Sequence, residues 1–389
     1  MSTVIKNALI YDAYTWGEKK DIKIDDGEIT MVGENVSADE EIDLNGYSIL
    51  PGFFDAHMHL VSGSELFSDE SLKEWAQSGI LTVRDMGFGG KQTLEEFVEW
   101  VNSINTNPET AQVVTAGRFI TAPHGYGHIM GGHENGIAVK GAEEAKEAVL
   151  KMKKLGCHGI KTAADMERFD PETPVLSAEE FKALIEEARK NNMWIGAHIQ
   201  HTEYMRVLLE ANIPEFAHMS LDNVPDEMLR EMVEKNIYVT PTLSVIDAPR
   251  PPLPPGELPP EMKEMMEKMA AIDTHEQEQN AIDNVRRFVE MGGKVALGTD
   301  TMRMTESDKK QGIPIHELEL LQQAGLSMQQ LVTAATLNSA HVCGLDNEQG
   351  SIKAGKTANL IAIKGELGED VNVFKNVDFV MHYGKVIKS

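Results

Sequence analysis

The feature that most constrains the fold is a regular alternation of apolar runs and helical patterns through the middle of the chain. Eight short apolar runs are typical of buried strands, and they cover residues 52–60, 79–87, 111–121, 157–165, 193–200, 214–220, 236–245 and 294–300. Strands that alternate with helices form parallel β/α units, and eight such units are the number that closes a barrel. We therefore predict the α/β class and a (β/α)8 TIM barrel over residues 51–344.

The helical patterns between these runs carry recognisable ends. Residues 142–156 have apolar positions at helical spacing and end in Gly156, a suitable residue just past a helix C-terminus. Residues 177–192 open with Ser177 and Glu180, the spacing of a capping box. A doubly wound open sheet is the structural alternative. It is less consistent with the sequence, because no glycine-rich phosphate loop follows the first strand.

The two ends of the chain differ from the middle. Residues 1–50 contain short β-rich segments separated by turn signals such as DDGE and LNGY, and residues 345–389 have the same character. We expect these two stretches to form one small β-sandwich domain built from both termini, beside the barrel of residues 51–344.

Composition excludes several classes of partner. The 389 residues carry a formal net charge of −26, which disfavours nucleic acid and anionic membrane surfaces. No run approaches the roughly 18 apolar residues of a membrane span, and no leader pattern opens the chain. The two cysteines, Cys157 and Cys343, suit a reducing compartment rather than a disulfide framework. These observations predict a cytoplasmic protein.

Ionisable side chains lie near the carboxyl ends of the predicted strands. The first run, PGFFDAHMHL, places two histidines at positions i and i+2, which point to the same face of a strand. The complete set comprises His57, His59, Lys161, His198, His218 and Asp300. In a closed barrel these strand ends converge. Each residue alone is also compatible with an ordinary core histidine or a salt-bridged lysine, but buried polar groups need partners, and the set indicates a shared cation.

The residue types favour a divalent metal. Four histidines and a carboxylate suit zinc, although manganese, iron or cobalt accept the same ligands. Lys161 is different, because an ammonium group has only donors and cannot ligate a cation. It can contribute if its neutral amine carries CO2 as a carbamate, whose two oxygens can bridge two metal ions.

These motifs resemble the amidohydrolase superfamily, in which HxH stands on strand one, lysine on four, histidine on five and six, and aspartate on eight. LPGFFDAHMHL, ILTVRDMG, LGTD and LVTAATLNSAHVCGLDNEQGSIKAGKTANLIAI resemble the branch of prolidase-like peptidases, arginine/lysine carboxypeptidases and imidazolonepropionase. Nearly the whole chain takes part. The family's usual GKxADL is GKTANL here, with Asn359 outside the metal motifs.

The resemblance implies two divalent metal ions, expected to be zinc. His57 and His59 would bind the more buried ion with Asp300. The second ion would be held by His198 and His218. Carboxylated Lys161 and a hydroxide would bridge the two ions. The hydroxide would attack a scissile carbonyl, and Asp300 would pass its proton to the leaving amine.

Two further roles follow from the same resemblance. Tyr238 matches a tyrosine that donates to the substrate carbonyl, with an aromatic core residue as the alternative. Where this sequence has ITAPHGYGHIMGGHE, the family often has a GGHGH-like loop. His128 aligns without gaps and is expected to contact a substrate carboxylate, with His124 and His133 as alternatives.

A proline-rich insertion follows the seventh strand. Residues 247–260, DAPRPPLPPGELPP, favour extended polyproline II conformation. They are either a stiff surface linker or a lid, since this position belongs to the carboxyl-terminal face of a barrel.

The sequence therefore predicts a metal-dependent hydrolase that cleaves an amide or peptide bond adjacent to a free carboxylate, in a dipeptide such as Xaa-Pro or in an N-acyl amino acid. Hydrolysis of a cyclic amide or imidazolone is the alternative within the superfamily. A non-catalytic metal-binding scaffold is a remote third reading. The expected partner is a small molecule with a carboxylate, and a symmetric homo-oligomer is expected.

Overall fold

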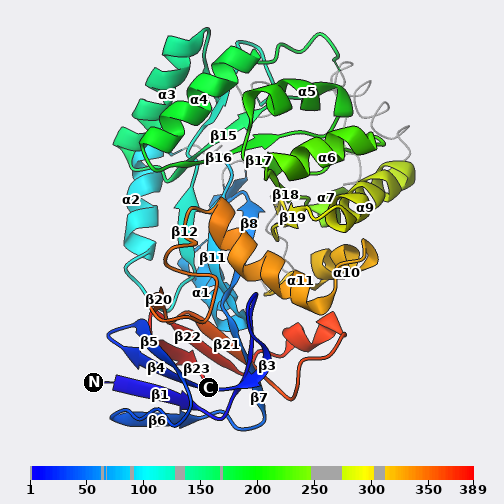
Figure 1. Cartoon of the computed structure of the whole chain (residues 1–389). Coiled ribbons are helices and arrows are strands. Elements are labelled where there is room, and N and C mark those ends of the chain that lie inside the picture. The colour runs from blue at the N-terminus through cyan, green and yellow to red at the C-terminus, as the bar shows by residue number, and fades with distance from the viewer. Residues whose placement is uncertain are drawn as a thin grey trace, which may run out of the picture.

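The computed structural model describes residues 2–62, 65–66, 68–87, 92–127, 136–166, 170–246, 274–301 and 312–389. Strands from both ends of the chain form two sheets at the bottom of Figure 1. The five-stranded sheet has the order β20(Lys356–Thr357), β5(Glu28–Gly33), β4(Asp21–Asp25), β1(Ser2–Lys6) and β6(Glu40–Asp43). The six-stranded sheet has the order β23(Lys385–Lys388), β22(Phe379–His382), β21(Leu360–Lys364), β7(Tyr47–Pro51), β2(Leu9–Tyr11) and β3(Trp16–Lys19).

These two sheets share one apolar core. Ile22 and Ile24 of β4 belong to the same buried cluster as Ile49 of β7 and Leu360 of β21. β21 pairs antiparallel with β7, so residues 360–364 lie beside residues 47–51 although more than 300 positions separate them. Burial of this shared face therefore joins the two ends of the chain.

The middle of the chain forms parallel strands, which confirms the α/β class. The strands are β8(Phe53–Met58), β11(Ile80–Asp85), β12(Gln112–Thr115), β13(Phe119–Thr121), β15(Gly159–Ala163), β16(Trp194–His198), β17(Glu215–Ala217), β18(Tyr238–Thr240) and β19(Lys294–Val295). Each of the eight predicted runs contains strand residues. The third run is divided into β12 and β13, and Gly117 between them has a φ of 70° that ends the first strand.

Hydrogen bonds connect the strands in chain order. Two sheets have the orders β12-β11-β8 and β14-β13-β15-β16-β17-β18-β19, in which β14(Gly136–Ala138) is an edge strand outside the chain order. His158 N–H donates to Thr115 O at 2.8 Å, which joins the segments around β12 and β15. At the other side, Ala56 N–H of β8 donates to Leu297 O at 2.8 Å, just after β19. The first and last predicted strands are therefore neighbours.

Helices surround these strands in Figure 1. They are α1(Asp69–Ser78), α2(Leu94–Ile104), α3(Ala142–Leu155), α4(Ala178–Lys190), α5(Thr202–Ala211), α6(Asp226–Glu234), α7(Leu243–Ile246), α9(Thr274–Glu290), α10(Ile315–Gln323), α11(Met328–Thr333) and α12(Ser339–Val342). The short elements are β9(Val61–Ser62), β10(Glu65–Leu66), β14(Gly136–Ala138), the π-helical turn η2(Ala334–Asn338) and the 3-10 turn η3(Val371–Lys375).

The predicted helix ends are confirmed. Gly156 follows α3 with a φ of 94° and donates its backbone N–H to the last turn. The Ser177 hydroxyl accepts from Glu180 N–H while the Glu180 carboxylate accepts from Ser177 N–H, which completes a capping box at the start of α4. Such caps satisfy backbone groups that the helix itself leaves open.

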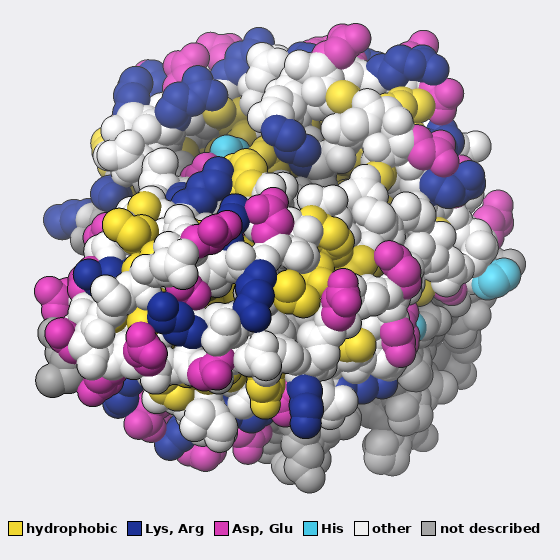
Figure 2. Space-filling model, turned by 60° about the horizontal axis from the view of Figure 1, so that its bottom comes forward, with side chains coloured by type: hydrophobic (Ala, Val, Ile, Leu, Met, Phe, Trp, Pro, Cys, Tyr) yellow, Lys and Arg dark blue, Asp and Glu magenta, His cyan; other side chains and the backbone are white. Residues whose placement is uncertain are grey.

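The face in Figure 2 carries basic and acidic side chains intermixed, with scattered apolar ones between them. Within the described ranges, no helix is long and apolar enough to cross a membrane. Cys157 and Cys343 are both buried and unpaired.

Candidate metal centre

The ends of β8 and β19 bring the first three predicted ligands together. His57 is the fifth residue of β8, and His59 lies just past its end. Asp300 Oδ1 is 3.4 Å from His57 Nε2 and 3.2 Å from His59 Nε2. One ligand atom from each residue lies within 4.8 Å of the others. These three side chains therefore converge closely enough to bind one ion.

The LGTD sequence allows this close approach. A Cβ on Gly298 would lie 2.7 Å from His57 Cβ and 2.8 Å from His57 N, so only glycine fits. The N–H groups of Thr299 and Asp300 both donate to His57 O, at 3.1 and 2.6 Å. Asp300 has a φ of 54°, a left-handed conformation that aspartate tolerates better than most residues. This turn directs its carboxylate at the histidines.

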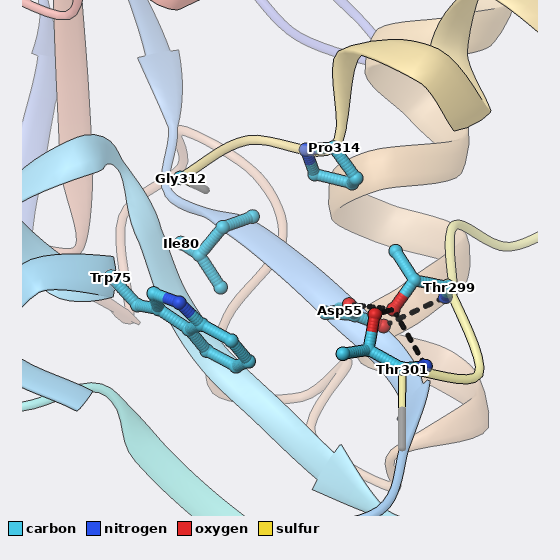
Figure 3. A pocket seen from close by; sticks show the side chains of 7 residues that line it. All are labelled: Asp55, Trp75, Ile80, Thr299, Thr301, Gly312 and Pro314. Atoms are coloured by element: carbon cyan, nitrogen blue, oxygen red, sulfur yellow. Dashed lines mark hydrogen bonds between the residues drawn. The ribbon is translucent and has the colours of Figure 1, made fainter. Parts of the chain in front are cut away.

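The Asp55 carboxylate binds the turn that carries Asp300 through hydrogen bonds to Thr299 (Figure 3). Its carboxylate accepts hydrogen bonds from Thr299 N–H at 3.1 Å and from the Thr299 hydroxyl at 2.7 Å. It also accepts from His57 N–H at 3.2 Å. The Thr299 and Thr301 hydroxyls lie 2.8 Å apart. Asp55 thus fixes both segments that carry ligands, and the sequence analysis did not identify it.

Lys161, His198 and His218 complete the cluster. Lys161 is fully buried in β15, with Nζ 3.4 Å from His57 Nε2. The His218 ring lies 4.6 Å from the His57 ring and 4.6 Å from the His198 ring, measured between centroids. The structure therefore brings together all six side chains predicted as metal ligands.

Neutral partners fix two of the rings. His59 Nδ1 lies 3.1 Å from Gly87 O, and His218 Nδ1 lies 2.6 Å from the Thr242 hydroxyl. His218 and Thr242 have φ values of 98° and 50°. Glu317 holds the following turn by accepting from Leu243 N–H at 3.0 Å. Backbone held in such rare conformations is common at functional sites.

Burial sets the protonation of the cluster. It lowers the pKa of His57 and of His218 well below the ordinary value, and that of His198 to about 4. Burial alone would raise the pKa of Asp300, but the adjoining imidazoles outweigh it and hold that pKa well below its usual value. Near neutral pH His57, His198 and His218 are therefore neutral and Asp300 is ionised, the forms that ligate metals. Burial alone would lower the pKa of His59, but the adjoining Asp300 carboxylate outweighs it and raises that pKa.

The donor set fits divalent metal ions. Imidazole nitrogens and a carboxylate oxygen are the ligands preferred by zinc and related ions. His57 Nδ1 and His198 Nε2 are buried and have no hydrogen-bond partner among the described residues. Among the described residues, no carboxylate oxygen lies within 4.0 Å of Lys161 Nζ. Burial lowers the pKa of Lys161 to about 7, so its amine is readily neutral and able to form a carbamate.

The structure does not bring Tyr238 to this cluster, and the expected contact with a substrate carbonyl stays a prediction. Tyr238 is the first residue of β18, whereas the clustered residues lie at or after strand ends or, for Lys161, in mid-strand. Its ring stacks on His341, with centroids 4.4 Å apart, and Lys294 Nζ is 5.2 Å from it. The alternative reading, a packed aromatic residue, describes this position.

Other predicted positions are only partly described. His128 and His133 lie outside the described residues, as does the insertion at 247–260. His124 is described and is exposed, with a φ of 61°.

Two aromatic residues were missed by sequence analysis. Tyr126, in the same HGYGH segment, stacks on His198 with centroids 4.0 Å apart. Phe119 lies nearly parallel to the His59 ring, with centroids 6.4 Å apart. Aromatic residues in an apolar strand and a glycine-rich loop gave no signal that distinguishes this position from ordinary packing.

The fold and cluster thus define an α/β protein in which histidines and a carboxylate, residue types that suit a metal ion, gather near the strand ends. The amidohydrolase family model matches residues 48–387, and the chain belongs to this family. It is 26% identical over 379 residues to the ochratoxinase of Aspergillus niger, covering 87% of this chain and 74% of that protein. It is 25% identical over 431 residues to the imidazolonepropionase of Thermoanaerobacter pseudethanolicus, covering 98% of this chain and 90% of that protein.

Solved structures have the same fold. A Xaa-Pro dipeptidase crystallised with methionine in its active site superposes with a TM-score of 0.79 at 22% identity, covering 100% of both chains. The structure of A. niger ochratoxinase gives a TM-score of 0.79 at 20% identity, covering 100% of this chain and 96% of that chain.

We expect Lys161→Met to stabilise the metal-free protein. The pKa of Lys161 is about 7 when folded and ordinary, near 10.5, when unfolded, so the unfolded chain binds more protons between these values. Wild-type stability should therefore rise with pH across this window. At pH 7.5, Lys161→Met should raise the free energy of unfolding by on the order of 2–4 kcal/mol, and the gain should vanish near pH 10.5.

Urea unfolding in chelator and bicarbonate-free buffer, at several pH values, measures this gain. Lys151→Met, at an exposed position in α3, is the control and should change stability little at any pH. A destabilised Lys161→Met protein, or a gain independent of pH, would contradict the expectation.

Proposed function

We propose that this protein is a metal-dependent hydrolase that cleaves an amide or peptide bond adjacent to a free carboxylate in a small molecule. One observation carries the proposal: six side chains able to ligate or bridge metals, from in or just after five separate strands, converge in one cluster. Membership of the amidohydrolase family supports the hydrolase class.

We also propose the closed form of the fold and its division. The strands at residues 53–300 would form a (β/α)8 barrel, which is supported by the hydrogen bond from Ala56 N–H to Leu297 O. The barrel would occupy residues 51–344. Residues 1–50 and 345–389 would form a separate β-sandwich, supported by the core that their two sheets share.

Two divalent ions, zinc in the first instance, would occupy the cluster. His57, His59 and Asp300 would hold one ion, and His198 and His218 the other. Lys161, as a carbamate, would be a ligand shared by both ions. Bound ions would supply Lewis acidity toward the scissile carbonyl and lower the pKa of water.

Asp300 is the proposed proton carrier. Its ionised carboxylate can accept a proton from the attacking water at Oδ2, because Oδ1 faces the two histidines. The protonated carboxyl can then deliver this proton to the leaving nitrogen. The left-handed turn held by Asp55 keeps the carboxylate in place, so little reorganisation is needed during the reaction.

The substrate contact is proposed at the loop after β13. His128 is the proposed partner of the substrate carboxylate, with His124 and His133 as alternatives. The proposed substrates are Xaa-Pro and other dipeptides and N-acyl amino acids. The dipeptidase named among the similar structures supports the first of these.

A cyclic amide or imidazolone is the second candidate substrate. It is favoured by the imidazolonepropionase relative, whose similarity extends over 98% of this chain. A non-catalytic scaffold is disfavoured, because every position of the cluster is filled, including Asp300.

The deciding experiment measures product release by the zinc-loaded protein from paired substrates. Each dipeptide or N-acyl amino acid is paired with its C-terminal amide, and cyclic imides and imidazolones are included. We expect hydrolysis of free acids and a loss of at least about tenfold in kcat/KM on amidation, because the charge-assisted contact to the substrate carboxylate is removed. Equal rates on both members would contradict the carboxylate requirement, and turnover of rings alone would establish the second candidate.

A further inference from the structure

Asp165 lies beside the cluster and is not one of its predicted ligands. It follows β15, four residues after Lys161, and its side chain is 1% exposed. Its Oδ1 lies 2.6 Å from His201 Nδ1 and accepts from Met166 N–H at 2.8 Å. Its Oδ2 accepts from Gln200 N–H. The carboxylate therefore ties the end of β15 to the segment that follows β16.

This carboxylate faces His198. His198 Nε2 lies 3.7 Å from Asp165 Oδ2 and has no hydrogen-bond partner among the described residues. Stacking of Tyr126 on one face of the ring and edge contact with His218 limit its rotation. A carboxylate oxygen has more than one lone pair, so Oδ2 can accept from His198 as well as from Gln200.

His198 differs in this respect from the other imidazoles of the cluster. His59 Nδ1 is 3.1 Å from a backbone carbonyl, and His218 Nδ1 is 2.6 Å from the Thr242 hydroxyl, both uncharged partners. The Asp300 carboxylate lies beside Nε2 of His57 and of His59, but Asp300 is itself a predicted ligand. Among the described residues, His198 instead has a carboxylate from outside the predicted ligand set opposite one nitrogen. A carboxylate in this place selects the tautomer and increases the basicity of the other nitrogen.

We propose that Asp165 is a positioning residue that holds His198 as the Nε2–H tautomer, so that the Nδ1 lone pair is available to a divalent cation. The proposal rests on the proposed function, since it assumes that His198 is a metal ligand. It further implies that the His198–His218 half of the cluster depends on Asp165, whereas the His57–His59–Asp300 half depends on Asp55.

The test measures zinc affinity and stoichiometry by competition with a chromophoric chelator. In Asp165→Asn, we expect one of two zinc equivalents to bind about 10- to 100-fold more weakly and the other to be unchanged. In Asp165→Glu, which keeps the buried charge, we expect a smaller loss. His201→Asn removes the contact on Oδ1 but leaves Oδ2, so both equivalents should retain wild-type affinity.

A double-mutant cycle separates positioning from general loosening of the fold. In the His198→Ala background, Asp165→Asn should cause no further change in the affinity of the remaining equivalent. If Asp165→Asn binds both equivalents like the wild type, or if His201→Asn weakens zinc equally, the positioning role is wrong. A further loss of affinity in the His198→Ala background would also overturn it.

Failure of this inference differs from failure of the proposed function. A wild-type protein that binds fewer than two equivalents would contradict the proposed two-ion site itself. If the wild type binds two zinc equivalents and Asp165→Asn binds both with the same affinity, only the role of Asp165 is contradicted. If Asp165→Asn does not fold, Asp165→Glu and His201→Asn still decide, since their expected losses differ.

Discussion

Lys161→Ala is expected to lose high-affinity metal binding and more than about 1,000-fold of turnover, because several kcal/mol of electrostatic stabilisation would disappear with it. The physical argument starts from burial. Lys161 is fully buried, with Nζ 3.4 Å from His57 Nε2 and 5.7 Å from the centroid of the Phe119 ring. A permanent ammonium in this position would repel the cations that the surrounding imidazoles are suited to bind.

A neutral amine resolves this conflict. Burial lowers the pKa of Lys161 to about 7, and a neutral amine reacts with CO2 to give a carbamate anion and a proton released to solvent. The substitution removes that anion and leaves a space of nearly its size. Acetate or propionate should therefore restore part of both metal content and activity in Lys161→Ala.

Metal analysis after gel filtration, together with kcat on the best substrate, tests this expectation with and without added acid. Lys161→Met is the matched control, since it fills the space and should not respond to acetate. Two bound ions and a full rate in Lys161→Ala would show that the bridging role is wrong.

The sequence predicted the cluster because its signals are local. His57 and His59 are two residues apart on an apolar strand, and strand geometry alone places them on one face. The other ligands were predicted from the convergence of strand ends, which follows from the fold. Asp55 and Asp165 carried no such signal. Their partners, Thr299 and His198, lie 244 and 33 positions further along the chain, so no local sequence pattern connects either pair.

Tyr238 was assigned from the family resemblance, and its place in the fold shows what a sequence match leaves undetermined. The apolar run at residues 236–245 indicates a strand but not which of its residues lie at the carboxyl end. The strand begins at Tyr238 and ends at Thr240, and two residues along a strand correspond to about 7 Å. Tyr238 therefore lies against His341, and the residue that contacts His218 is Thr242.

Asp300→Asn is expected to lower kcat by about 100- to 10,000-fold with little change in KM, the range attributed to a positioned proton carrier. Asparagine has nearly the same shape as aspartate and accepts left-handed backbone, so the φ of 54° can be kept. The variant keeps an oxygen that can face His57 and His59. What it removes is the negative charge and the capacity to take up and return a proton.

The pH dependence distinguishes proton transfer from metal loss. The imidazoles hold the pKa of Asp300 well below its ordinary value, so the wild-type carboxylate stays ionised through mildly acidic pH. Residual activity in Asp300→Asn should rise with pH toward the alkaline range, because hydroxide in solution replaces the missing base. Asp226→Asn, an exposed change on α6, is the matched control and should keep the wild-type profile. If Asp300→Asn binds two zinc ions and retains the wild-type kcat and pH profile, Asp300 is a ligand alone, and the proton must be carried by another group.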